Sequence, residues 1–354
     1  MLSVLNMKFR IIILLFISAL LAQNVPAIQV SGLYQATIPV TDESITKRKL
    51  AIRQALIQVL IKLTGDRNIR NSSDILPLIE RSERYVQQFR YKQVYGQGQE
   101  SILLTELSVQ FNETALNEGL RNYGMTIWGQ ERPSILVWLA YEQNQIRHLV
   151  SFEDNPEYMD MLDEGATTRG LSLMFPLLDL EDSSQINISD VWAGFKEPIS
   201  NASNRYQADV ILTAKIIQVL PNLWESEWTA YINHQTENWT NQGVLAEIVL
   251  NEGIDELADR IATQYANTGS SITEVIELLV VDINDLNKYA RVLSYLESVQ
   301  SISSVQVQRV SRNEVMFTLV NRGGLSAINQ SIALGKTLTL VSENEQLIYR
   351  LLPK

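Results

Sequence analysis

Three acidic residues, Asp179, Glu181 and Asp182, have the types and spacing that best suit chemistry in this sequence. They follow an apolar run, Leu171 to Leu178, which predicts a buried strand. Ligands commonly bind where the strands of open α/β sheets end, and three carboxylates there could hold magnesium or calcium. A solvated loop in which one acid caps the next helix is the simpler interpretation, because no paired base or glycine-rich loop accompanies the triplet.

A second acidic group comprises Glu153, Glu157, Asp160 and Glu164, which are spaced to lie on one face of a helix. Like charges on one face cost stability, so the row could be kept for a basic partner or a cation. A solvated helix face is the simpler explanation.

Three tryptophans form the other candidate surface. Trp224 and Trp228 lie on one side of a strand predicted over residues 223–232, and Trp239 on the neighbouring strand could extend the row. Such a row can grip a peptide, a glycan or a lipid chain, although aromatic rows more often cover the core of a sheet. We take the three tryptophans and the three acids as candidate binding residues.

The sequence offers little for catalysis. Its two histidines, His148 and His234, have no third ligand at the spacing of a metal site, and no nucleophile-elbow or nucleotide-binding motif is present. Gly323 and Gly324 resemble an anion-binding turn but fit the start of a helix better. We therefore assign no catalytic residue, metal or cofactor. The rival interpretation is a metal-assisted hydrolase that uses the acidic triplet, with His148 as a further group.

The amino-terminal segment predicts export. Lys8 and Arg10 precede the apolar run Ile11 to Ala22, and Val25-Pro26-Ala27 offers a cleavage site, so residues 1–27 fit a signal peptide. A membrane span needs about 20 apolar residues, which favours removal of the segment over anchoring. The chain has no cysteine, which excludes disulfides and thiolate metal sites. We expect a mature protein without a transmembrane span, either soluble or peripherally attached to a membrane.

Charge is spread unevenly along the chain. Residues 28–132 carry 13 Lys and Arg against 11 Asp and Glu, residues 133–268 carry 6 against 21, and residues 269–354 carry 8 against 8. The middle region therefore has a net charge of 6 − 21 = −15. So acidic a surface repels phosphate backbones, which argues against nucleic acid as a partner.

These patterns predict a mixed α+β fold with three small domains. The first, residues 28–132, has a strand at 29–40, helices at 45–63, at 73–88 and ending near 124, and a hairpin of 91–95 with 101–111. The second, residues 133–268, has strands at 135–141, 171–178, 210–219, 223–232 and near 239, with helices at 155–169, around Trp192 and at 253–265. Its strands 171–178 and 210–219 suit a βαβ unit with a helical crossover.

The third domain, residues 269–354, follows a linker at 266–271. Its predicted order is strand 275–283, helix 285–298, strands 302–310 and 315–320, helix 325–334 and strand 337–341, with a possible last strand at 346–352. That order is the βαββαβ of a ferredoxin-like domain.

Several segments together resemble a known family. They are RQALIQVLIKLTGD (residues 53–66), RGLSLMFPLLDLED (residues 169–182), Trp192 and Ala208-Asp209. They are similar to the bacterial envelope family known as domain of unknown function 2066, over residues 28–266. The resemblance implies a Gram-negative periplasmic location. It implies no activity, because none is established for that family.

From these patterns we expect a non-catalytic binding or assembly module of the cell envelope. Its partner would be an envelope protein or another periplasmic protein, and the acidic middle domain with its tryptophan strand would be the contact surface. Two alternatives stay open, the metal-assisted hydrolase and a binder of a small apolar ligand between domains.

Overall fold

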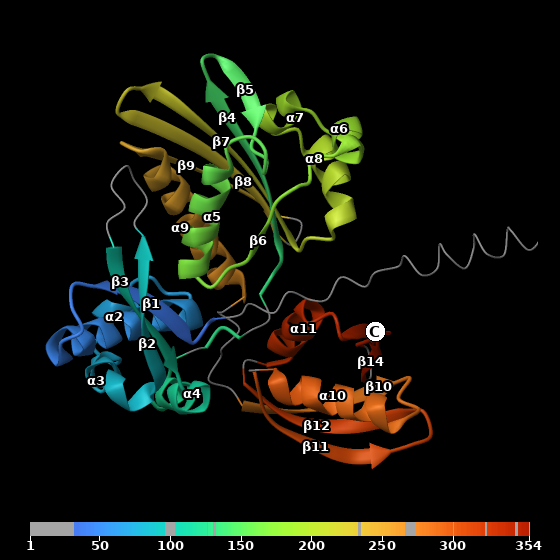
Figure 1. Ribbon diagram of the computed structural model, residues 1–354. Coiled ribbons are helices and arrows are strands. Elements are labelled where there is room, and N and C mark those ends of the chain that lie inside the picture. The colour runs from blue at the N-terminus through green and yellow to red at the C-terminus, as the bar shows by residue number, and fades with distance from the viewer. Residues whose placement is uncertain are drawn as a thin grey trace, which may run out of the picture.

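A computed structural model describes residues 32–95, 103–125, 127–129, 132–232, 235–265, 273–299, 301–322, 324–343 and 346–353. The predicted signal peptide at 1–27, the linker at 266–271, His234 and Gly323 lie outside these ranges. The described chain is a mixed α+β fold with three sheets (Figure 1), which confirms the predicted class. We call each sheet with its helices the first, middle or third unit. Within these ranges no helix combines the length and apolar character needed to cross a bilayer.

The first unit has a three-stranded antiparallel sheet in the order β1-β3-β2, and a long helix, α2, covers one face. Ser44 caps the start of α2 by accepting a hydrogen bond from the Lys47 amide, and Gly65 ends it with a φ of 72°. The strands are β1 (Gln35–Val40), β2 (Val86–Tyr95) and β3 (Leu103–Phe111). The helices are α2 (Ile45–Thr64), α3 (Leu76–Glu80), α4 (Glu113–Asn122) and two 3-10 turns, Ile69–Asn71 and Ser82–Tyr85.

The helix predicted over residues 73–88 is wrong at its carboxyl end. Only α3 forms, a 3-10 turn follows, and β2 already begins at Val86. From Phe89 onward the residues of β2 pair with those of β3, for example Phe89 with Val109 and Arg90 with Ser108. Pairing with a buried strand therefore outweighed the local helical pattern.

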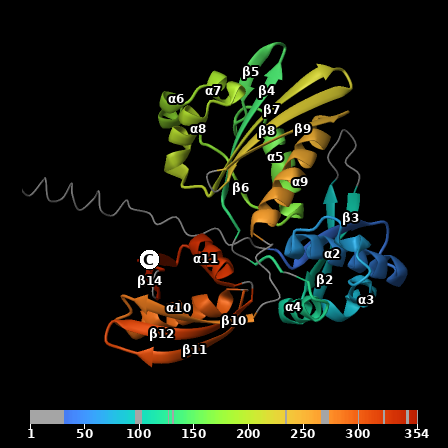
Figure 2. The same cartoon turned by 180° about the vertical axis from the view of Figure 1, so that it is seen from behind.

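The middle unit has a mixed sheet in the order β5-β4-β7-β8-β9, with β6 also paired to β4. β4 runs parallel to β6 and β7, and the other pairs are antiparallel. Helices α5 and α9 pack on one face, and α6, α7 and α8 pack on the other (Figures 1 and 2). The strands are β4 (Ile135–Gln143), β5 (Ile146–Leu149), β6 (Leu173–Met174), β7 (Val210–Leu220), β8 (Leu223–Ile232) and β9 (Gln235–Gly243). The helices are α5 (Pro156–Thr168), α6 (Leu180–Gln185), α7 (Ile188–Ala193), α8 (Lys196–Ser203), a 3-10 turn (Asn204–Tyr206) and α9 (Ala246–Tyr265).

The strand predicted over residues 171–178 is almost absent, since only Leu173–Met174 forms β6. Pro176 has no amide hydrogen to donate, and Leu178 adopts a φ of 52°, so the chain turns away from the sheet. The helical crossover to β7 is present as α6, α7 and α8. It connects two strands that run parallel to β4 on its opposite sides.

The third unit has a five-stranded sheet in the order β11-β12-β10-β14-β13, with α10 and α11 on one face. The last strand, β14, inserts between β10 and β13 and runs parallel to β10, whereas a ferredoxin-like sheet would place β13 there. Leu347, Tyr349 and Leu351 of β14 alternate inward and are buried, while most of β13 is exposed, so β14 fills the inner place. The elements are β10 (Thr273–Val281), α10 (Leu286–Ser298), β11 (Ile302–Val310), β12 (Glu314–Arg322), α11 (Gly324–Leu334), β13 (Leu338–Ser342) and β14 (Leu347–Leu351).

A polar contact joins the first and middle units. Arg169 at the end of α5 donates to the Gly65 carbonyl oxygen at 2.9 Å and to the carboxylates of Asp255 and Asp259 on α9. Arg132 stacks on Trp128 with its guanidinium carbon 3.6 Å from the ring centre. Both arginines are buried. The contact therefore consists of the ion pairs of Arg169 and the stacking of Arg132 on Trp128.

Candidate functional site

The carboxylate of Asp179 is held by an arginine that lies later in the sequence. Asp179 caps the start of α6 by accepting hydrogen bonds from the Glu181 and Asp182 amides at 3.1 and 3.0 Å. Arg205, in the 3-10 turn after α8, donates to its two oxygens at 2.8 and 3.1 Å. The hydrogen bond from Arg205 is the largest cause that lowers the pKa of Asp179 to about 2.

Asp182 is the buried member of the triplet, with 1% of its surface exposed. It accepts hydrogen bonds from the Leu178 amide at 2.9 Å, the Tyr206 hydroxyl at 2.6 Å and Arg205 at 3.1 Å. The Tyr206 oxygen in turn accepts from the Leu177 amide at 2.9 Å. Burial first, and then the bond to Asp182, raise the pKa of Tyr206 to about 12.

These contacts make the triplet a structural network. The guanidinium of Arg205 offsets the charge of Asp179 and Asp182, and Glu181 lies 3.6 Å from the same group. A cation could bind the carboxylates of Asp179 and Asp182 only by displacing Arg205. It would also have to displace the hydrogen bonds that Asp182 accepts from Tyr206 and Leu178. In the part of the chain that the structure describes, no group of three or more acidic or histidine side chains is arranged to hold a metal ion.

The network fixes the short segment Leu177–Leu180, which we call the leucine loop. Leu178 has a left-handed backbone, an unusual conformation for a residue other than glycine, and its amide is tied to Asp182. The side chains of Leu177 and Leu180 are 61% and 91% exposed. The sequence hides this surface, because Leu177 and Leu178 belong to the run that predicts a strand and Leu180 stands alone among the acids; only Pro176 and those acids signal a turn.

The predicted tryptophan row exists, and it lies beneath α9. Trp228 and Trp239 are 1% and 9% exposed, and their rings stack with centres 6.0 Å apart and an angle of 2° between planes. The Trp228 indole nitrogen donates to the Ser226 hydroxyl at 2.8 Å. Trp224 is partly buried and packs against the same core. The two stacked rings are thus occupied by contacts within the middle unit.

The remaining predicted groups lie apart from one another. His148 on β5 stacks on Tyr141 with ring centres 5.0 Å apart, and its Nδ1 lies 3.5 Å from an Asp154 oxygen. Glu157, Asp160 and Glu164 lie on α5 with exposed side chains, as a solvated face requires. Glu153 precedes that helix, so the predicted row of four is a row of three.

The low pKa of Asp179 predicts a dependence of stability on pH. Its folded-state value of about 2 lies below the ordinary value of 3.8, so the ionised form stabilises the fold above about pH 4, and this contribution is lost as the pH falls through 2. Asparagine at position 179 can still cap α6, but it has no charge and so cannot form the ion pair with Arg205. The difference in free energy of unfolding between wild type and Asp179→Asn, measured by urea denaturation, should be constant from pH 5 to pH 7 and shrink toward pH 2. An equal difference at every pH would show that the Arg205 pair does not contribute.

Comparison with known proteins gives one family match. Residues 27–129 match the model of a family described as Domain of unknown function (DUF8605). This finding corrects the resemblance to domain of unknown function 2066, which is a different family and is not supported. Most segments that carried that resemblance, residues 169–182, Trp192 and Ala208-Asp209, lie outside the matched range. A search of curated proteins gave no match.

Proposed function

We propose that this protein is an exported, non-catalytic binding module of the bacterial cell envelope that contacts a protein partner through the leucine loop. The observation that carries the proposal is the pairing of two exposed leucines with a backbone held by a buried carboxylate. Under this proposal the three units correspond to domains at residues 28–132, 133–268 and 269–354, after a signal peptide at 1–27.

A single exposed leucine is ordinary on a protein surface. The leucine loop differs because the Leu177 amide donates to the Tyr206 hydroxyl and the Leu178 amide donates to Asp182. The loop is therefore ordered before any partner binds. A preorganised apolar segment loses less conformational entropy on binding, and burial of each leucine contributes about 1.5–3 kcal/mol. Phe195 is exposed and directly precedes α8, the helix that packs against α6. Its ring could extend the contact.

The charge of the middle region favours a protein partner over a membrane. Its net charge of 6 − 21 = −15 repels the anionic lipids that attract basic segments to membranes. A protein surface with an apolar centre and a basic rim would complement both the leucines and the acidic surroundings. Export is supported by the basic residues Lys8 and Arg10 before the apolar run.

Replacement of both leucines by serine should weaken partner binding strongly while the protein stays folded. Because Leu177 and Leu180 are exposed, Leu177→Ser/Leu180→Ser should change the free energy of unfolding by no more than about 0.5 kcal/mol. Loss of two apolar contacts should weaken binding about 100-fold. Binding is measured with the purified variants against a partner first isolated by crosslinking in intact cells.

Leu286→Ser is the matched control, since Leu286 is 78% exposed but begins α10 in the third unit. It should bind as the wild type does. If the double variant binds equally well, the leucine loop is not the contact surface. The same cells are fractionated, and mature protein found in the cytosol would contradict export.

A further inference from the structure

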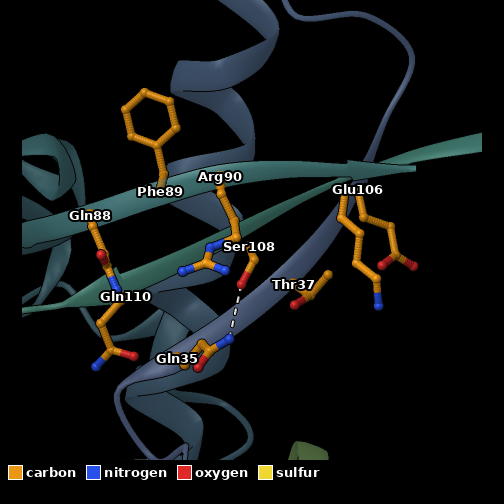
Figure 3. A pocket seen from close by; sticks show the side chains of 9 residues that line it. Gln35, Thr37, Gln88, Phe89, Arg90, Glu106, Ser108 and Gln110 are labelled. Carbon is orange, nitrogen blue, oxygen red and sulfur yellow. Dashed lines mark hydrogen bonds between the residues drawn. The ribbon is translucent and has the colours of Figure 1, made fainter. Parts of the chain in front are cut away.

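The first sheet has a hollow on the face opposite α2. The hollow has a volume of about 490 Å³ and is lined by residues of all three strands (Figure 3). Pairing in register places Arg90 of β2 opposite Ser108 of β3, and Lys92 opposite Glu106. Thr37 of β1 lies opposite Ser108 on the other side. The volume is within the range of sites for small molecules.

The chemistry of the lining is polar. The ring of Phe89 points to the opposite face, where Arg48 of α2 lies over it, and every other lining side chain carries a hydroxyl, an amide or a charge (Figure 3). Gln35 donates to the Ser108 hydroxyl at 2.9 Å, and Gln110 donates to a backbone carbonyl at 3.3 Å. The polar ends of the remaining lining side chains make no hydrogen bond or ion pair with the described part of the chain.

Arg90 gives the hollow its charge. Glu106 faces Lys92 across the strands, so these two charges offset each other, while Arg90 faces the neutral Ser108. Figure 3 shows the Arg90 side chain extending over the face of the sheet among Ser108, Gln110 and Gln35. The surrounding region, residues 28–132, has a net charge of 13 − 11 = +2, in contrast to the acidic middle region.

We propose that this hollow binds a small hydroxylated molecule that carries a phosphate or a carboxylate, with the guanidinium of Arg90 holding the anionic group. A guanidinium presents two parallel N–H donors that match the oxygens of either anion. The amides and hydroxyls around it supply the short-range donors and acceptors that a hydroxylated body requires. The site belongs to the first unit and is independent of the leucine loop.

The test compares three probes by isothermal titration calorimetry with the full mature chain: glucose 6-phosphate, glucuronate and uncharged glucose. At least one anionic probe should bind at least tenfold more tightly than glucose, and the stronger of the two identifies the anionic group. Arg90→Gln should reduce that preference at least tenfold, as expected for a lost charge-assisted pair of hydrogen bonds. Glu106→Gln should strengthen binding of the anion, because it removes the carboxylate that lines the hollow among the described residues.

Arg84→Gln is the matched control. Arg84 is an exposed arginine of the same unit that does not line the hollow, so its variant should keep the preference. The proposal is overturned if neither anion binds better than glucose, or if Arg90→Gln and Arg84→Gln behave alike. An unchanged affinity in Glu106→Gln would equally oppose an anion at this position.

Discussion

Replacement of Trp228 by alanine should lower the free energy of unfolding by about 3–5 kcal/mol, the range found when a large aromatic side chain is removed from a core. Trp228 is fully enclosed between β8 and α9, where its ring stacks on Trp239. The packing is close enough that a Cβ atom added at Gly253 of α9 would overlap the indole. Because α9 packs this closely on the indole, removal of the ring should leave a cavity between β8 and α9.

The measurement is urea denaturation followed by circular dichroism. Trp224→Ala is the control within the same row, because Trp224 is only partly buried and its variant should lose less stability. A Trp228→Ala protein as stable as the wild type would show that the stacked pair does not support the middle core. The same experiment bears on function, since a variant that unfolds cannot report whether a tryptophan contacts a partner.

Arg169→Ala should also destabilise the protein, by about 1–3 kcal/mol, because it removes a buried donor from a backbone carbonyl and from two partly buried carboxylates. The side chain of Arg169 is 3% exposed and joins the Gly65 carbonyl of the first unit to Asp255 and Asp259 of α9. Without it, the Gly65 carbonyl oxygen loses its donor, Asp255 loses this partner, and Asp259 keeps the exposed Arg67. The loss should fall on the contact between the two units.

Arg67→Ala is the control for this prediction, since Arg67 pairs with the same Asp259 but is 45% exposed. An exposed pair contributes less than about 1 kcal/mol. Thermal unfolding by calorimetry should show a large fall in the transition temperature for Arg169→Ala and a small one for Arg67→Ala. Equal shifts for the two variants would contradict the structural role of the buried arginine.

The elements predicted best are those in which local pattern and tertiary packing agree. The apolar stripe of residues 45–63 and the stop at Gly65 predicted α2 almost to its ends. The strands 210–219 and 223–232 were predicted almost to the residue, because long runs with clear periodicity leave little choice. The helix predicted over residues 253–265 begins earlier, at Ala246, where packing on β8 and β9 completes α9.

The misses arose where distant residues decide the conformation. The run Leu171 to Leu178 predicts a strand, but Pro176 and the bonds of Asp182 to Leu178 and Tyr206 turn its end into a loop that exposes Leu177. The acidic triplet lies at the start of α6, where Asp179 caps the helix. Its partner Arg205 lies in another element, and no spacing in the sequence connects the two.

The most direct test of the proposed contact surface is site-specific photocrosslinking in intact cells. A photoreactive amino acid replaces Leu180, which is 91% exposed and so tolerates a larger side chain, or in a parallel strain replaces Leu286. We predict a discrete crosslinked protein product in the periplasmic fraction for position 180 and none for position 286. The absence of any product at position 180, or the same products at both positions, would contradict it.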